Sequence, residues 1–144
     1  MENAKKHLRI LGYLFYVVAI IDIASIIYAA TNLSSISNII GLSDIEPATA
    51  KGALIALIIY DVVACLLKLF LGSKALGEVK GTYNGTAHIT MSTILLVINV
   101  IGLALCIYAL CTGQGYASKL VDLVVTVVIL LDYRQQSKTL RESK

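Results

Sequence analysis

Residues 89–110 read ITMSTILLVINVIGLALCIYAL. This stretch contains no Asp, Glu, Lys or Arg, and as an α-helix it would extend about 33 Å, close to the roughly 30 Å hydrocarbon core of a bilayer. A single amide side chain, Asn99, lies near its middle. The stretch therefore predicts a membrane-spanning helix that carries a polar group near its middle.

Three further apolar stretches surround this one, at residues 10–30, 53–71 and 116–133. Hydrophobic residues make up 58% of the 144 residues and charged residues only 15%. A soluble protein of this size could not bury that much apolar surface. We expect an all-α polytopic membrane protein, a single domain built as a four-transmembrane-helix bundle. Its connections are predicted at residues 31–52 (outer loop), 72–86 (cytoplasmic loop) and 134–144 (cytoplasmic tail).

The Lys and Arg residues set the expected orientation. Most of them lie at the two chain ends and around the middle loop: Lys5, Lys6, Arg9, Lys68, Lys74, Lys80, Arg134, Lys138, Arg141 and Lys144. Only Lys51 and Lys119 fall on the other side, so the positive-inside rule predicts that both termini are cytoplasmic. The net charge of +3 requires no nucleic-acid partner. Binding of anionic lipid by the tail is the alternative use of these charges.

Several local signals place the helix ends. Pro47 suits the first turn of the second spanning helix, and Thr86 is a predicted N-cap with His88 in the following turn. Lys74 and Glu78 have the spacing of an i,i+4 ion pair on an extension of the second helix. In the outer loop, four apolar residues at helical spacing predict a short amphipathic segment on the membrane surface: Leu33, Ile36, Ile39 and Ile40.

Each apolar stretch has one strongly polar residue near its centre: Asp22, Asp61, Asn99 and Asp122. With a rise of 1.5 Å per residue and alternating directions, all four fall within a slab less than about 10 Å deep. A carboxylate at the bilayer centre costs about 2.5 to 3.5 kcal/mol on insertion scales, so three of them need a compensating environment or a function.

The expected partners of these acids are few. Lys68 is seven residues after Asp61 on the same helical face, Lys119 is placed to reach water, and Tyr60 is the one Tyr beside a mid-membrane acid. At least one Asp is then expected to be protonated or to share a bound cation. The alternative is that each Asp only hydrogen-bonds a neighbouring helix and holds the bundle together.

Signatures of enzymes are absent from the sequence, which has no Walker loop, nucleophile elbow or HExxH helix. We therefore expect no catalytic residues and no cofactor. The three Cys follow no metal-ligand spacing and are expected to be reduced packing residues, so no metal site is predicted.

Residues 66–88, LLKLFLGSKALGEVKGTYNGTAH, and residues 94–105, ILLVINVIGLAL, resemble small, uncharacterised four-span membrane proteins of Gram-positive bacteria. The resemblance covers roughly the second half of the chain and implies a bacterial plasma membrane. In architecture alone the chain is similar to small multidrug resistance transporters, which use a Glu in the first helix to exchange protons for organic cations. This chain has Asp22 instead, contains no Trp and has a longer outer loop, so no residue is carried over.

The sequence thus leads to two functional hypotheses. In the first, an intramembrane polar site formed by Asp61 and Asp22, with Asn99, Asp122, Tyr60 and Lys68 nearby, binds a proton or small cation during solute transport. In the second, the chain is a non-catalytic accessory or scaffolding subunit of a membrane complex. A thin bundle of this size is expected to act in the lipid bilayer as a homo-oligomer or beside a membrane partner subunit.

Overall fold

The computed structural model describes residues 2–32, 47–111 and 117–142, and every regular element in these ranges is an α-helix. The helices are α1 (Glu2–Thr31), α3 (Pro47–Lys80), α4 (Ala87–Cys111) and α5 (Ala117–Glu142). The prediction of an all-α fold with four long helices is confirmed for the described residues. The amphipathic segment predicted at residues 33–40 lies outside them.

Three of the helices, α1, α3 and α4, are long and apolar enough to cross a membrane. Only 17–28% of the residues in their most apolar windows are buried inside the protein, so most of this apolar surface faces outward, as lipid contact requires. These helices contain the predicted stretches 10–30, 53–71 and 89–110. The fourth, α5, differs because it has four charged residues in its first 18 positions: Lys119, Asp122, Asp132 and Arg134.

Helix ends follow the local chemistry that the sequence predicts. Helix α3 begins at Pro47 and continues past the apolar stretch to Lys80. There Gly81 adopts a φ of 75°, and the N–H groups of Gly81 and Thr82 donate to the carbonyls of Glu78 and Gly77, which is the Schellman arrangement. Helix α4 begins directly after Thr86, whose carbonyl accepts from the N–H of Ile89.

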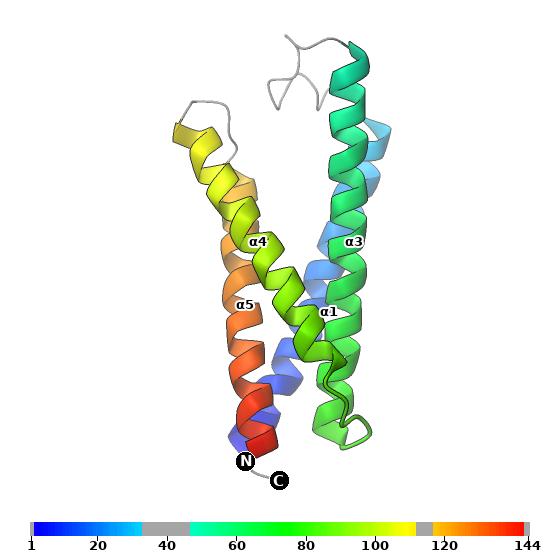
Figure 1. Ribbon diagram of the computed structural model, residues 1–144. Helices are drawn as coiled ribbons and strands as arrows, with labels where there is room; N and C mark the ends of the chain where they lie inside the picture. Colours follow the sequence, from blue (N-terminus) through cyan, green and yellow to red (C-terminus); the bar gives the residue numbers. More distant parts are fainter. Residues whose placement is uncertain (1, 33–46, 112–116, 143–144) are drawn as a thin grey trace.

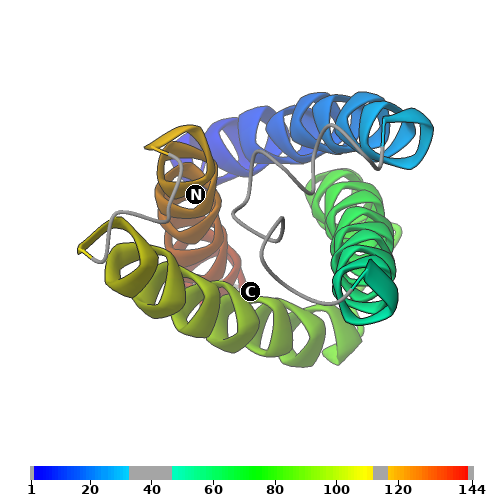
Figure 2. The ribbon, with the colours of Figure 1, turned by 90° about the horizontal axis from the view of Figure 1, so that it is seen from above.

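The four helices surround a common axis in the order α1, α3, α4, α5 (Figure 2). The most extensive contacts are between α1 and α3, followed by those between α4 and α5. Figure 1 shows that these two pairs approach each other at the end where both termini lie and stand apart at the opposite end. We call these the termini end and the open end.

The α1–α3 contact depends on two glycines. A Cβ atom added to Gly72 would lie 3.0 Å from the carbonyl oxygen of Gly12 and 3.3 Å from Cβ of Phe15. A Cβ added to Gly12 would lie 3.0 Å from Leu76. Small residues allow helix backbones to approach closely in this way, which is how membrane helices gain van der Waals contact.

The hydrophobic core occupies the half of the bundle nearest the termini end. Fully buried members come from all four helices and include Phe15, Leu71, Leu95 and Leu130. On the open-end side of this core, the interior includes charged side chains, among them Asp22 and Asp122. The core therefore closes the lower half of the bundle and leaves the carboxylates of the upper half beside a cavity.

Candidate functional site: an acidic cavity between two helix pairs

A cavity of about 350 Å³ opens between the helix pairs on the open-end side of the core. Its lining residues come from α1, α3 and α5: Ile21, Asp22, Ser25, Asp61, Lys119 and Asp122. The three Asp residues that the sequence analysis predicts at one depth, Asp22, Asp61 and Asp122, therefore line one space, which we call the acidic cavity. The rise per residue predicts one level for them, and the structure adds that they line the same cavity.

Asp22 has the closest cationic partner in the cavity. The Lys68 ammonium group donates to Asp22 Oδ2 at 2.6 Å, and both side chains are largely buried, with 5% of Lys68 and 15% of Asp22 exposed. Lys68 extends its stem along the seam between α1 and α3 to reach this carboxylate. The interpretation that Lys68 pairs with Asp61 is therefore wrong. Helical spacing along α3 showed the correct face but could not show that α1 supplies a closer acid.

Asp61 is paired instead with Lys119 of α5. Lys119 Nζ lies 3.3 Å from Asp61 Oδ1 and 3.7 Å from Asp122 Oδ2, so one ammonium group bridges two carboxylates. These side chains are more exposed, at 49% for Lys119, 32% for Asp61 and 36% for Asp122. The sequence had suggested that Lys119 turns toward water. Its half-exposed side chain does so only in part, because its charged end lies between the two acids.

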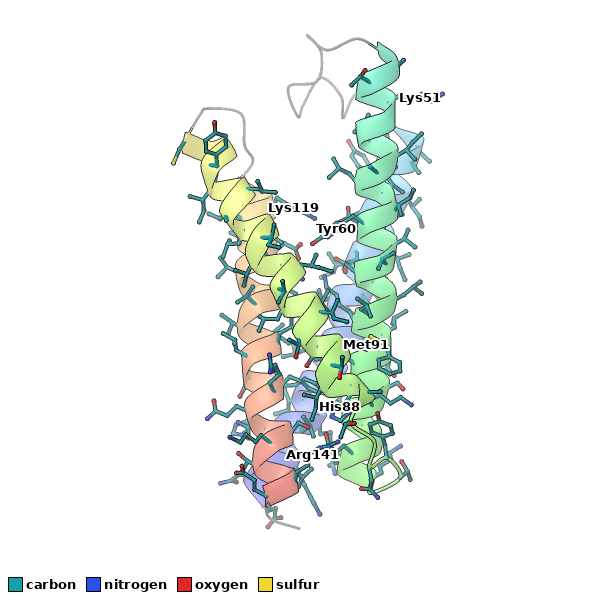
Figure 3. All side chains as sticks on the ribbon, viewed as in Figure 1. Lys51, Tyr60, His88, Met91, Lys119 and Arg141 are labelled. Atoms are coloured by element: carbon teal, nitrogen blue, oxygen red, sulfur yellow. The ribbon has the colours of Figure 1, made fainter. Side chains whose placement is uncertain are left out.

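Tyr60 and Lys119 point toward each other across the space between α3 and α5 (Figure 3). Both also line a neighbouring apolar pocket of about 470 Å³, whose other walls include Ile101, Gly102 and Leu105 of α4. Tyr60 thus lies beside the acidic cavity, on its apolar side. Lys119 belongs to both spaces and connects them.

Asn99 does not line the acidic cavity. Its side-chain amide donates to the carbonyl of Leu95 in the same helix at 2.8 Å, and the residue is 4% exposed. The rise per residue predicts the same depth in the membrane for Asn99 as for the acids. The Asn99 side chain does not point into the acidic cavity, and depth along one helix does not predict the direction in which a side chain points.

Among the described residues that line or contact the acidic cavity, three carboxylates face two ammonium groups, those of Lys68 and Lys119. One negative charge is therefore unbalanced when all five groups are ionised. In the described ranges, no three His, Cys, Asp or Glu side chains lie close enough together to hold a metal ion. Ser25 supplies a hydroxyl to the lining, and sequence analysis did not single it out as a site residue.

Comparison of the chain with protein-family models, with curated proteins and with solved structures gives no match. The chemistry of the cavity must therefore be interpreted from its own residues.

Proposed function

We propose that this protein is a multi-pass plasma-membrane protein whose acidic cavity binds a proton or a small cation during transport of a small solute. The observation that carries the proposal is the unbalanced negative charge in the cavity. Asp61 and Asp122, each about one third exposed, share the single ammonium group of Lys119, and a proton or a bound cation would balance the remaining negative charge. A site of this kind can load and release its cation as the surrounding helices rearrange.

The proposal includes α5 as a fourth span. Its two charged residues in the apolar part, Lys119 and Asp122, are at the acidic cavity, so they need not face lipid. Four spans put both termini on one side, and the basic residues near the termini end make that side cytoplasmic by the positive-inside rule. The bacterial plasma membrane is proposed from the resemblance of residues 66–105 to four-span proteins of Gram-positive bacteria.

A homo-oligomer is also part of the proposal, because four helices offer little enclosed volume for a complete pathway. The exposed apolar residues of α4, such as Val97, Ile101 and Leu105, are available for lipid or for a second copy. Cross-linking of the protein in native membranes tests this point: a ladder of defined oligomers supports it, and monomer alone overturns it.

The functional proposal is tested with purified protein in liposomes that contain a pH-sensitive dye. A Na⁺ or K⁺ gradient is imposed, and the internal pH is followed. We expect a pH change that requires the protein, that disappears with Asp61→Asn and that persists with Glu142→Gln, which removes an exposed carboxylate at the termini end. Protein-containing liposomes that behave like empty ones with both cations would overturn the proposal and favour the accessory-subunit hypothesis.

A further inference from the structure

A second polar cluster lies at the termini end, where α3, α4 and α5 meet. It consists of Glu78, His88, Ser137 and Arg141, and we call it the Glu78 cluster. Ser137 Oγ donates to Glu78 Oε2 at 2.8 Å, and Arg141 Nε donates to Glu78 Oε1 at 2.9 Å. His88 Nε2 lies 3.1 Å from Ser137 Oγ and 3.4 Å from Glu78 Oε2. Both carboxylate oxygens of Glu78 are therefore occupied from neighbouring helices.

Three members of the Glu78 cluster are closed to solvent, and the fourth, Arg141, is 25% exposed at its edge. Glu78 is 2% exposed, and His88 and Ser137 are fully buried. Figure 3 shows His88 and Arg141 close together between the lower ends of α4 and α5. Arg141 Nη2 also donates to the carbonyl of Gly85, in the turn between α3 and α4. The cluster thus joins the ends of three helices and one turn.

The sequence had predicted a different partner for Glu78. In the structure Lys74 Nζ lies over the ring of Tyr83, 4.6 Å from its centroid, and Glu78 contacts Arg141 instead of Lys74. The i,i+4 rule considers only one helix, whereas the carboxylate gains hydrogen bonds and a buried ion pair from α5. A charged pair with complementary hydrogen bonds is the form in which ionised groups tolerate burial.

One face of α5 runs from the acidic cavity to the Glu78 cluster. Along it lie Asp122, Thr126, Tyr133 and Ser137, separated by four, seven and four residues, which is the spacing of one helical face. Thr126 is 2% exposed, and Tyr133 and Ser137 are fully buried. Polar groups therefore follow the interior of the bundle on both sides of its apolar core.

Several of these polar groups lack partners. Within residues 2–32, 47–111 and 117–142, three buried side-chain atoms have no hydrogen bond, and they are His88 Nδ1, Thr126 Oγ1 and Tyr133 Oη. All three residues lie on or against this interior face, since the rings of His88 and Tyr133 are in contact with centroids 5.9 Å apart. Buried polar atoms without partners are rare and costly, and water that enters the interior would satisfy them.

We propose that the Glu78 cluster is the inner gate of a pathway that starts at the acidic cavity and follows this face of α5. The gate is closed in the structure, because Glu78 holds α5 and the start of α4 against α3. When the contacts of Glu78 with Arg141 and Ser137 separate, water reaches Tyr133 and Thr126 from the termini end. That a cation moves along this pathway rests on the proposed transport function. The opening of the gate can be measured separately, as access of water-soluble reagents to the interior.

The test places a single cysteine behind the gate. Thr126→Cys is introduced after the three native cysteines are replaced by alanine, and the protein is reconstituted in right-side-out and inverted liposomes. A charged, membrane-impermeant thiol reagent is added, and the labelling rate is measured from each side. We expect slow labelling from the termini end with Glu78 intact, and at least tenfold faster labelling from that end with Glu78→Gln.

Two further variants keep the test decisive. Ser137→Ala removes one hydrogen bond to Glu78 but leaves the ion pair with Arg141, so we expect a smaller acceleration from the same side. Glu142→Gln is the matched control, because its carboxylate is 67% exposed and pairs with the exposed Lys138 at 3.7 Å. Its labelling rate should equal that of the parent.

Equal labelling rates in the parent, Glu78→Gln and Ser137→Ala would overturn the gate. Equal acceleration from both sides would also overturn it, since unfolding gives that result and an inner gate does not. If Glu78→Gln opens the termini end but no cation-dependent pH change occurs in liposomes, the gate stands and the transport proposal fails. If the cation-dependent pH change occurs but Glu78→Gln labels at the parent rate, the transport proposal is supported and the gate is overturned.

Discussion

Breaking the pair between Asp22 and Lys68 should destabilise the bundle strongly. Asp22→Asn leaves the Lys68 ammonium group, only 5% exposed, without its carboxylate. Removing one partner of a fully buried pair costs about 3–5 kcal/mol, and the 15% exposure of Asp22 favours the lower end, about 3 kcal/mol. By contrast, Asp61→Asn leaves Lys119, which is 49% exposed, beside Asp122 and within reach of water, so a loss of about 0–1 kcal/mol is expected.

A double-mutant cycle separates this pair from other effects. The free energy of unfolding is measured by circular dichroism while SDS is titrated into a mild detergent, for Asp22→Asn, Lys68→Met and both together. We expect the double variant to recover much of the stability that Asp22→Asn loses, because no buried charge then remains alone. The reasoning is refuted if Lys68→Met couples to Asp61→Asn as strongly as to Asp22→Asn.

Three more predictions follow from the packing and from the cavity. Gly72→Ala should cost about 1–3 kcal/mol in the same unfolding assay, because the added Cβ would meet the backbone of α1. Gly52→Ala, whose added Cβ would meet nothing within 4 Å, should be neutral or slightly stabilising. Equal effects of the two substitutions would contradict the close helix contact. Gly81→Ala should cost about 1–2 kcal/mol, since φ is 75° there, and an unchanged stability would argue against the left-handed turn. Lys119→Gln removes the ammonium group between two carboxylates and should tighten Na⁺ binding roughly tenfold by calorimetry at low salt; weaker binding would count against a cation site.

The helices could be predicted from the sequence because their cause is local. Each predicted helix rests on an apolar stretch of spanning length, and Pro47 and Thr86 mark helix starts through contacts within one turn. The constant rise per residue of an α-helix also predicts a common level for the acids. In the structure Asp22, Asp61 and Asp122 line one cavity.

The partners of the charged residues could not be predicted in the same way. Lys68 pairs with Asp22 and Glu78 pairs with Arg141, and these contacts join residues 46 and 63 positions apart. Spacing rules compare residues of one helix, so they favoured Asp61 for Lys68 and Lys74 for Glu78. The rotation of one helix against another decides such pairs. Asn99 was misplaced for the same reason, because its amide bonds its own helix.

The most direct test of the account is an infrared difference spectrum of the carboxyl groups. Protein in nanodiscs is compared with and without Na⁺ and across a pH titration, for the parent and for Asp61→Asn and Asp22→Asn. If the acidic cavity binds a proton or a cation, carboxyl bands should change on addition of Na⁺ or acid, with at least one of these changes lost in each Asn variant. Carboxyl bands that do not respond to Na⁺, or that respond identically in the parent and both variants, would contradict an acidic cavity that binds a proton or a cation.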